Sequence, residues 1–506
     1  MDTEVIQEGG LTRRRTAVIL ALIGLVITAF AVYRAATASF THDESYSYIY
    51  YVKLSYWELL QHVDGFTNNH LLNSVGLKLA DQFLGNSELS LRTPNLLALV
   101  LFLFYAARIL LKLPAWFAIC GFVVLGTNTY MLELFTLARG YGLSFGFMLM
   151  ALFYLIRGIQ QGRLRDMALF NVASLLATLS NFTLLNVHLA GLFTLYALLW
   201  VRISHGELPR KRLVPITLMN LTMVAVSIAA LWLPIEHMLE QSTLDFGGKS
   251  GFFSSTVATW IRSLLPWVQI PDAVMTVLYG VVIAIVAVAS VVTIWRIRNH
   301  DRSFFNRWTA LPTLLLVLVV TSVGGELQHA LFGVDRMMER FALFFVPMLV
   351  LLVMHLLALA YEQGWKRTPP AVVAIAALWG VLSFARGFGP YHSVEWGYDV
   401  RTKDAIHAIV KDMEARNYKG PPLHIGVNWL FEPALNFYRM QMDLDKIQHA
   451  DRNGFTENDA YRLAMKYEVD TTLFHGYERM EAFTESGTVL FKRSEALPGD
   501  TLGKQQ

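Results

Sequence analysis

Long apolar runs dominate the chain and predict a bundle of membrane-crossing helices. Eleven runs come close to the roughly 20 residues that an α-helix needs to span a bilayer. Their approximate bounds are 16–38, 94–112, 114–132, 141–157, 167–182, 184–201, 213–233, 273–295, 308–323, 341–360 and 371–386. The composition is 54% hydrophobic and the mean hydropathy is +0.42, whereas soluble proteins are nearer ~45–50% apolar. We therefore predict a polytopic α-helical membrane protein.

Basic residues fall in alternate connections between these runs and so predict their orientation. They are Arg13 to Arg15, Arg108, Lys112, Arg157, Arg163, Arg165, Arg202, Arg210 to Arg212, Arg296, Arg298, Arg302, Arg307, Lys366 and Arg367. The positive-inside rule places these connections and the N-terminus in the cytoplasm. We expect a multi-pass protein of the bacterial cytoplasmic (inner) membrane. An odd number of crossings leaves the C-terminal region outside. Ala36-Thr37-Ala38 permits a cleaved signal peptide as the competing interpretation, but the first run exceeds the ~7–15 residues of a signal core.

The connection 39–93 is a long outward-facing loop that we expect to carry its own helices. Ser55-Tyr56-Trp57-Glu58 has the form of a capping box. Leu72, Val75, Leu79 and Phe83 repeat at helical spacing before Gly85. The pattern predicts two amphipathic helices on the outer membrane surface, beside a cavity that is reached from the lipid.

After about residue 388 the apolar runs shorten and charge rises, which indicates a second domain. Leu423 to Asn428 predicts a buried strand between helices at 399–416 and 432–440, and 446–449, 468–474 and 488–492 are candidate strands. We therefore divide the chain into a membrane domain, 1–388, and a small extracytoplasmic α/β domain, 389–506. This region has no G-x-G-x-x-G or P-loop fingerprint.

Two adjacent acids, Asp43 and Glu44, follow directly on the first apolar run. Carboxylates at this depth are costly unless solvent, a partner or a ligand stabilises them. In a helix starting here, Asp43, Tyr46, Ser47 and Tyr50 share one face, which suits recognition of a polyol. The alternative is an interfacial collar of tyrosines with two solvated acids.

The other polar candidates also lie in outward loops or at outward helix ends. They are His70, Glu88, Arg92, Arg139, Tyr141, Glu339 and Arg340. Arginines held against apolar surface suit phosphate, because the guanidinium is a planar fork of donors. The alternatives are snorkelling to lipid headgroups for the arginines, a hydrogen-bonded surface histidine for His70, and a local Glu88–Arg92 ion pair.

The order of these motifs resembles the GT-C class of membrane glycosyltransferases, which includes the protein O-mannosyltransferases and the lipid A aminoarabinose transferases. The acid pair follows the first span, His70 lies in the same outer loop, and Gly85-Asn86-Ser87-Glu88-Leu89-Ser90-Leu91-Arg92-Thr93-Pro94 matches G-x-S-E-x-x-x-R-x-P. Ala138-Arg139-Gly140-Tyr141 is similar to the opening of the family's fourth span, and Glu339-Arg340-Phe341 with Pro347 to a late stretch near the donor phosphate. Where the family commonly has H-P-P-L, this chain has His70-Leu71-Leu72.

The resemblance implies transfer of a sugar from a polyprenyl monophosphate to an acceptor hydroxyl with inversion. It makes Asp43 the general base at a catalytic centre that also holds Glu44, and it places Arg139, Tyr141, Arg340 and Arg92 near the phosphate. Tyr46, His70, Glu88 and Glu339 complete the candidate site. We expect no cofactor and no metal-ligand cluster, although a divalent metal stays open.

Other functions and several details remain open at the level of the sequence. A secondary transporter or lipid flippase is the alternative function, although we find no internal repeat and little mid-span charge. A receptor-like protein is a third interpretation. The sugar stays open, as does the acceptor, which the sequence leaves as lipid A, a protein hydroxyl, a polysaccharide or a glycolipid.

Overall fold

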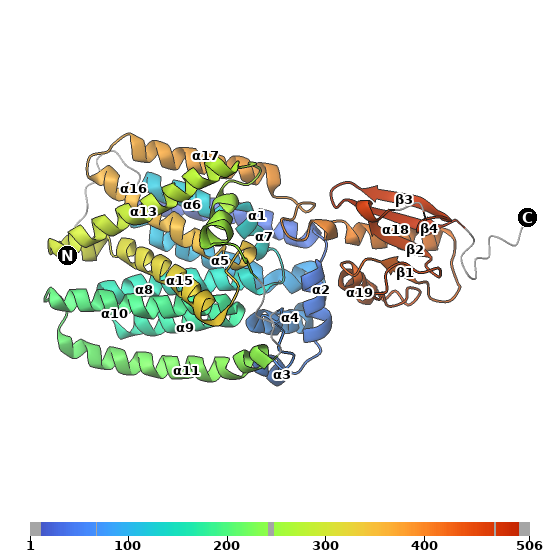
Figure 1. Ribbon diagram of the computed structural model, residues 1–506, viewed down its shortest axis with the longest axis horizontal. Coiled ribbons are helices and arrows are strands. Elements are labelled where there is room, and N and C mark those ends of the chain that lie inside the picture. Colours follow the sequence, from blue (N-terminus) through green and yellow to red (C-terminus); the bar gives the residue numbers. More distant parts are fainter. Residues whose placement is uncertain (1–11, 67, 241–246, 470–471, 495–506) are drawn as a thin grey trace, which may run out of the picture.

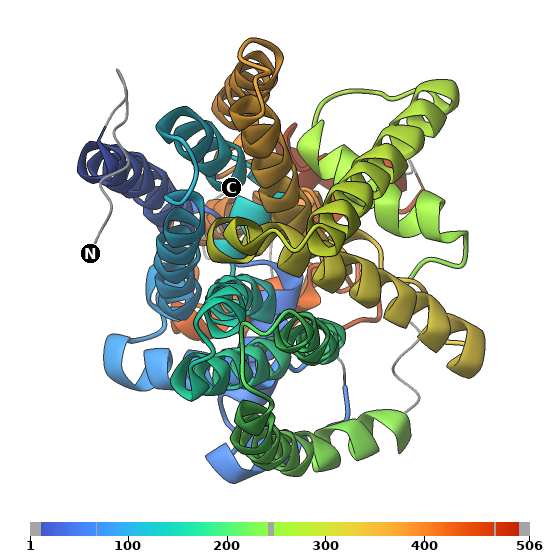
Figure 2. The ribbon, with the colours of Figure 1, turned by 90° about the vertical axis from the view of Figure 1, so that its left-hand side faces the viewer.

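The computed structural model describes residues 12–66, 68–240, 247–469 and 472–494. Long helices run side by side through the first part of the chain, and a small α/β domain lies beyond one end of them (Figure 1). Seen from the opposite end, these helices form a bundle viewed along their axes (Figure 2).

Each of the eleven predicted crossings is a helix or a bent pair of helices. The straight ones are α1 Arg13–Thr37, α5 Glu88–Leu110, α8 Gly140–Gln161, α9 Leu164–Ser180, α10 Leu185–Ser204, α11 Leu213–Glu240, α13 Asp272–Arg298, α15 Ala310–Phe332, α16 Phe345–Glu362 and α17 Thr368–Gly387. In the described part of the chain, nine helices are long and apolar enough to cross a membrane, or ten with the bent pair. The remaining one, α9, has 17 residues and is about 25 Å long at 1.5 Å per residue.

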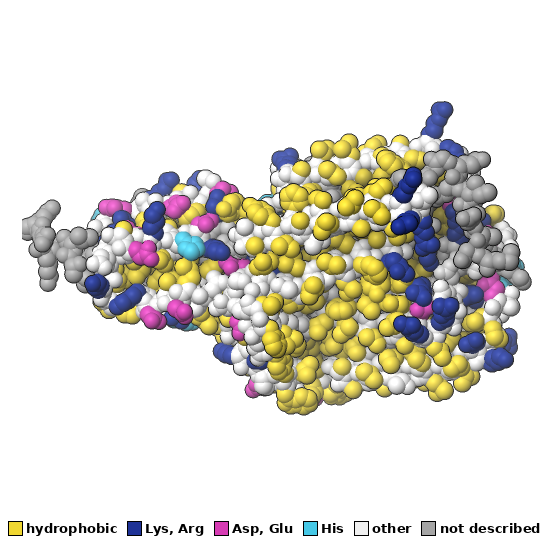
Figure 3. All heavy atoms as spheres, turned by 180° about the vertical axis from the view of Figure 1, so that it is seen from behind, with side chains coloured by type: hydrophobic (Ala, Val, Ile, Leu, Met, Phe, Trp, Pro, Cys, Tyr) yellow, Lys and Arg dark blue, Asp and Glu magenta, His cyan; other side chains and the backbone are white. Residues whose placement is uncertain are grey.

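Apolar side chains cover the flank of the bundle, and Lys and Arg gather at its end away from the α/β domain (Figure 3). This is the distribution that a lipid environment requires, because helices satisfy their own backbone groups and present apolar side chains outward. The polytopic helical fold is therefore confirmed.

The third predicted crossing is not one straight helix. It consists of α6 Ala115–Gly126 and α7 Thr129–Phe135, which meet at an angle of 64°. Asn128 caps α7 by accepting a hydrogen bond from the Met131 amide at 3.0 Å. Every residue of α7 is buried, and irregular backbone at membrane depth is tolerated where protein surrounds it.

The outer segment forms α2 His42–Tyr51, α3 Tyr56–Gln61 and α4 Leu71–Leu84. The predicted capping box is present, since Ser55 Oγ accepts from the Glu58 amide and Glu58 accepts from the Ser55 amide. Gly85 ends α4 with a φ of 85°, which a residue with a side chain rarely adopts. The second crossing, α5, begins at Glu88 rather than near residue 94, so Glu88 and Arg92 belong to that helix.

Short elements complete the membrane domain. They are η1 Phe182–Leu184, η2 Arg210–Arg212, the π-helix η3 Phe253–Val257, α12 Ala258–Leu264, α14 Arg302–Arg307 and η4 Glu339–Phe341.

The C-terminal domain contains a four-stranded sheet in the order β1-β2-β4-β3. Its elements are η5 Gly397–Asp399, α18 Thr402–Ala415, β1 Ile425–Val427, α19 Glu432–Gln441, β2 Tyr461–Met465, η6 Lys466–Glu468, β3 Tyr477–Phe483 and β4 Thr488–Arg493. The two predicted helices and the first and last predicted strands are confirmed. The strands expected at 446–449 and 468–474 were wrong. The first segment forms only an isolated bridge at Ile447, and the described part of the second contains no strand. Strands β2 and β3 were not predicted.

Hydrogen bonds attach this domain to the chain around the start of α2. The Phe40 amide donates to Tyr438 Oη at 2.7 Å, and the His42 amide donates to Asp399 Oδ2 at 2.7 Å. Burial raises the pKa of the Asp399 carboxyl well above its usual range, while this bond opposes the shift. Lys403 forms an ion pair with Glu88 at 2.6 Å. The α/β domain therefore holds the start of α2 in place.

A fully buried ion pair joins α2 to α5. Arg92 donates to both carboxylate oxygens of Glu44, at 2.8 and 2.7 Å, and neither side chain is exposed. Arg92 also donates to the carbonyls of Ala35, Ala38 and Ser39, while Glu44 accepts from the Thr41 and Ala138 amides. The pair consequently fixes where α1 ends and α2 begins.

We predict that Glu44→Gln destabilises the protein by about 3–5 kcal/mol, because it leaves the buried Arg92 charge without its partner. The measurement is the thermal unfolding temperature of the purified protein in detergent. Asp81→Asn is the matched control, since Asp81 is partly exposed and accepts from the Tyr48 hydroxyl. A Glu44→Gln variant as stable as Asp81→Asn would contradict the structural role.

Candidate active site

The first turn of α2 separates its two acids. Successive helical residues point about 100° apart, so Glu44 faces the interior while the Asp43 side chain is 17% exposed. Asp43 is also held through its backbone, because the Ser47 hydroxyl donates to the Asp43 carbonyl at 2.8 Å. Of the two acids, Asp43 is the one that a substrate can reach.

The Arg139 side chain packs against α2 and is almost completely buried. Its Nη1 donates to Ser47 Oγ at 2.8 Å and to the Asn68 carbonyl at 3.1 Å, and its Nη2 donates to Asn68 Oδ1 at 2.6 Å. Nη2 also lies 3.6 Å from Asp43 Oδ2. Arg139 therefore ties α2 to the loop before α4 and places a positive charge next to Asp43.

Arg340 approaches Asp43 from a different part of the chain and is more open, with 24% of its side chain exposed. Its Nη2 lies 3.9 Å from Asp43 Oδ2, and its Nε donates to Tyr141 Oη at 3.1 Å. Its Nη1 donates to Glu395. Burial acts to lower the pKa of Arg340, but Tyr141, Glu395 and Asp43 outweigh burial and raise it, so the guanidinium stays charged.

His70 and Tyr141 fill the space between the two arginines. His70 precedes α4, and its ring meets the edge of the Tyr141 ring at 4.9 Å. Burial and the charges of Arg139 and Arg340 lower the pKa of the His70 imidazole well below its usual range. His70 is therefore neutral, and its Nε2, 3.2 Å from Arg139 Nη2, accepts a hydrogen bond from that guanidinium.

The structure gathers five of the ten predicted site residues around one point, namely Asp43, His70, Arg139, Tyr141 and Arg340. The remaining five have other environments. Glu44 and Arg92 form their fully buried ion pair, and Glu88 contacts Lys403 and Tyr438. The Tyr46 ring lies against the Tyr50 ring, and the Glu339 side chain is exposed. A catalytic role for Glu44 and a phosphate-binding role for Arg92 conflict with this geometry, because either contact would require a fully buried charge pair to separate.

Glu339 contributes through its backbone. Its φ is 50°, in the left-handed region, and its amide donates to Thr259 Oγ1 at 3.0 Å. This turn directs the next side chain, Arg340, toward Asp43.

The sequence analysis missed Glu395, whose carboxylate lies against Arg340 and accepts from the Tyr130 hydroxyl. Trp396 beside it covers the Arg340 guanidinium at 5.2 Å. A charge count predicts that a second carboxylate is needed, because two outward arginines near apolar surface need more counter-charge than Asp43 alone provides, but it does not identify which one.

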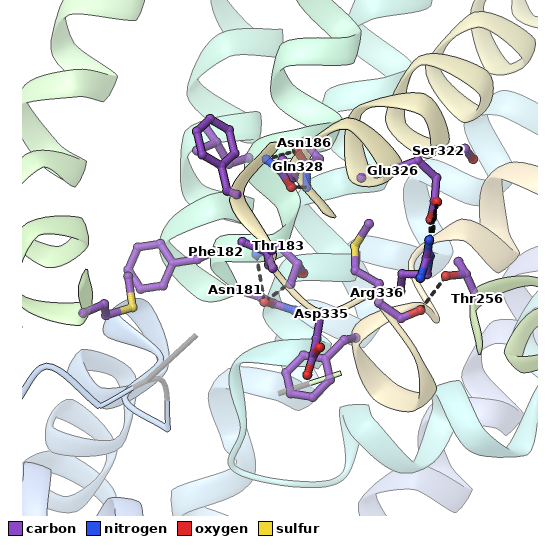
Figure 4. Close-up of a pocket in the computed structure, with 18 of the residues that line it drawn as sticks. Asn181, Phe182, Thr183, Asn186, Thr256, Ser322, Glu326, Gln328, Asp335 and Arg336 are labelled. Atoms are coloured by element: carbon purple, nitrogen blue, oxygen red, sulfur yellow. Dashed lines mark hydrogen bonds and ion pairs between the residues drawn. The ribbon is translucent and has the colours of Figure 1, made fainter. Parts of the chain in front are cut away.

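A cavity of about 740 Å³ lies between α10, α11, α15 and the residues after α15. Its polar wall contains the paired amides of Asn186 and Gln328, 2.9 and 3.0 Å apart, and the Glu326–Arg336 ion pair (Figure 4). Most of its other lining side chains are apolar, among them Phe182, Leu185, Ile235, Met238, Leu239, Phe252 and Phe332.

The two ends of this cavity differ in their surroundings. Leu239 and Phe332 line it and are strongly exposed in the last turns of α11 and α15. His70 and Phe341 also line it and adjoin Arg139 and Arg340. The cavity therefore extends from exposed apolar side chains to the neighbourhood of the charged cluster. No group of three or more His, Cys, Asp or Glu side chains in the described chain is placed to hold a metal, and the expectation about metals stays a prediction.

We predict that stability falls as the pH drops below about 6.5, partly because of His70. Unfolded histidine binds a proton near pH 6.5, whereas buried His70 does not. The unfolded state then holds more protons, so acid favours it by up to ~1.4 kcal/mol per pH unit for one such site. Unfolding temperatures between pH 7.5 and 5 should fall less steeply for His70→Gln. An equal slope in both proteins would contradict this assignment. Burial also lowers the pKa of His62, but this histidine is present in both proteins and contributes equally to their pH dependence.

Comparison with known proteins gives structural likeness only. No protein-family profile matches the chain, and no curated protein matches it. Among solved structures, it is similar to ArnT from Cupriavidus metallidurans in the apo state, with 12% identity and a TM-score of 0.49 over 94% of this chain and 97% of that one. For ArnT bound to undecaprenyl phosphate, the sequence identity is 12% and the TM-score is 0.42, with the same coverage of both chains. The chain is also similar to the oligosaccharyltransferase AglB from Archaeoglobus fulgidus, in complex with an inhibitory peptide and a dolichol-phosphate. Here the sequence identity is 11% and the TM-score is 0.45, over 96% of this chain and 74% of AglB. These neighbours are GT-C glycosyltransferases.

Proposed function

We propose that this protein is an inverting glycosyltransferase that moves a sugar from a polyprenyl monophosphate to an acceptor hydroxyl at the outer face of the bacterial cytoplasmic membrane. One observation carries the proposal. A partly exposed carboxylate, Asp43, lies 3.6 and 3.9 Å from two arginines, beside a cavity that extends to exposed apolar side chains of α11 and α15. Such a site combines a base with charge that can stabilise a departing phosphate.

The donor fits the cavity and Arg340 together. A polyprenyl chain entering from the lipid past Leu239 and Phe332 meets the apolar wall, and its phosphate reaches Arg340 near Phe341. Arg340 is suited to contact this phosphate because its guanidinium is partly exposed. Arg139 is almost fully engaged by Ser47, Asn68 and His70, so we assign it the positioning of Asp43 and a supporting charge.

The reaction needs no protein nucleophile. Asp43 accepts the proton of the acceptor hydroxyl as its oxygen attacks the anomeric carbon, and the bond from that carbon to the phosphate oxygen breaks on the opposite face. The electron pair leaves with the phosphate, whose added negative charge the arginines stabilise. Asp43 then releases the proton to solvent through its exposed edge. The Tyr46 and Tyr50 rings lie 4.3 Å apart on the helix that carries Asp43, and they offer aromatic surface for a sugar ring.

We predict that Asp43→Asn lowers kcat by roughly 10²–10⁴-fold, the range expected when a general base is lost. Binding of undecaprenyl phosphate should be retained, since Arg340 keeps its charge and loses a competing carboxylate. The measurement is release of free polyprenyl phosphate from a lipid-linked sugar by the purified protein. Full turnover by the variant would refute the role of Asp43. No release by the wild type with any lipid-linked sugar and envelope acceptor would refute the transferase.

We also predict that Ser322→Phe weakens binding of undecaprenyl phosphate at least about tenfold, because the ring fills the cavity that Ser322 lines. Ser290→Phe is the matched control. Both serines are half-buried in a spanning helix and donate to the carbonyl four residues earlier, at 2.8 and 2.7 Å, but Ser290 does not line this cavity. Equal binding by the two variants would show that the donor uses another route.

A further inference from the structure

Glu395 is a carboxylate that the proposed chemistry does not use, although it lies directly against the arginine that would hold the donor phosphate. One of its oxygens accepts from Arg340 Nη1 and the other from the Tyr130 hydroxyl. Its side chain is 8% exposed. Glu395 is thus a fixed counter-ion with little contact with water.

The segment that carries Glu395 is held by the membrane domain. The Arg34 guanidinium of α1 donates to the carbonyls of Gly389 and His392, at 3.1 and 2.9 Å. The Glu133 carboxylate of α7 accepts from the Val394 amide at 3.0 Å and from the Ser393 hydroxyl. The membrane domain therefore sets the position of the Glu395 carboxylate.

All three nitrogens of the Arg340 guanidinium already face a partner. Nε donates to Tyr141, Nη1 donates to Glu395, and Nη2 faces Asp43. A bidentate phosphate needs two N–H groups on one edge of the guanidinium, and the edge formed by Nη1 and Nη2 already faces the Glu395 and Asp43 carboxylates. Asp43 is required as the base and Tyr141 is neutral, so Glu395 is the partner whose exchange leaves the chemistry intact and removes a repulsive charge.

The charges of the cluster support the same conclusion. Asp43 and Glu395 balance Arg139 and Arg340, so an anionic donor enters a site without surplus positive charge. The donor is a phosphodiester with one negative charge, whereas the released monoester carries about −1.5 to −2 at pH 7. The product would therefore bind Arg340 more tightly than the donor does, and its release would be slow without a competitor.

We propose that Glu395 competes with the phosphate of donor and product for Arg340, and that its return to Arg340 promotes release of polyprenyl phosphate. This inference rests on the proposed function. It makes Glu395 a positioning residue that limits donor affinity and speeds turnover.

The test measures binding of undecaprenyl phosphate to the purified full-length protein, and then donor kinetics. Glu395→Gln should bind the probe about tenfold more tightly, because it removes a charge that opposes the phosphate. It should also lower both KM for the donor and kcat, with stronger inhibition by product. A merely structural role would instead weaken binding. Asp404→Asn removes a carboxylate that pairs with Arg401 in the α/β domain, and should leave binding unchanged.

A double-mutant cycle shows whether the effect passes through Arg340. Glu395→Gln should give no gain in the background of Arg340→Gln. Glu395→Asp keeps the negative charge on a shorter side chain, and it replaces Glu395→Gln in the test if that variant does not fold. Its affinity for undecaprenyl phosphate should be higher than that of the wild type. Unchanged or weaker binding by a folded Glu395 variant overturns the inference. If the wild type and Arg340→Gln bind the probe equally, the proposed phosphate site itself fails.

Discussion

The cost of placing charge away from water governs this structure at the point where the first helix ends. Glu44 and Arg92 can be buried only together, because either one alone would be an uncompensated charge. Their pairing brings the first turn of α2 against α5 and against the carbonyls at the end of α1. Once Glu44 faces inward, helical geometry turns Asp43 toward the arginines. The position of the proposed base therefore follows from the burial of its neighbour.

The same constraint applies to the charged cluster itself. Arg139 and Arg340 are stabilised by Asp43, Glu395 and several neutral oxygen or nitrogen acceptors. The two arginines and the two carboxylates balance in charge, so the cluster needs no bound anion to offset its charge. An anion that approached Arg340 would meet the Asp43 and Glu395 carboxylates as well as the guanidinium, and these like charges would oppose its binding.

The sequence predicts the helices well because lipid imposes a simple rule on composition and length. It did not predict the break between α6 and α7, although Thr127-Asn128-Thr129 interrupts the apolar run there, because the apolar residues on both sides dominate an average over a whole span. In the C-terminal domain, β2 is buried at every position and shows no alternation, and β3 is largely exposed. Both strands therefore lack the period-two signal of a half-buried strand.

The site was predictable in part, because polar residues outside the membrane stand out against apolar runs. Asp43, His70, Arg139, Tyr141 and Arg340 come from four separate stretches, and their shared sidedness pointed to a common location. Which of Asp43 and Glu44 faces inward could not be predicted, since both occupy the same helical turn and the choice depends on where Arg92 packs. Glu395 is 55 residues from Arg340 along the chain, and only the folding of the segment after α17 brings them together.

The contacts of the C-terminal domain bear on its relation to the site. Tyr438 and Asp399 accept hydrogen bonds from the Phe40 and His42 amides, and Ser39 donates to the Val400 carbonyl at 3.1 Å. Without the domain, the amides of Phe40 and His42 would lose their acceptors close to Asp43. This loss costs free energy unless water molecules accept those hydrogen bonds instead. Detachment of the domain would therefore alter the start of α2 as well as expose its own core. The edge strand β3, which is largely exposed, is not among the elements whose side chains make these contacts.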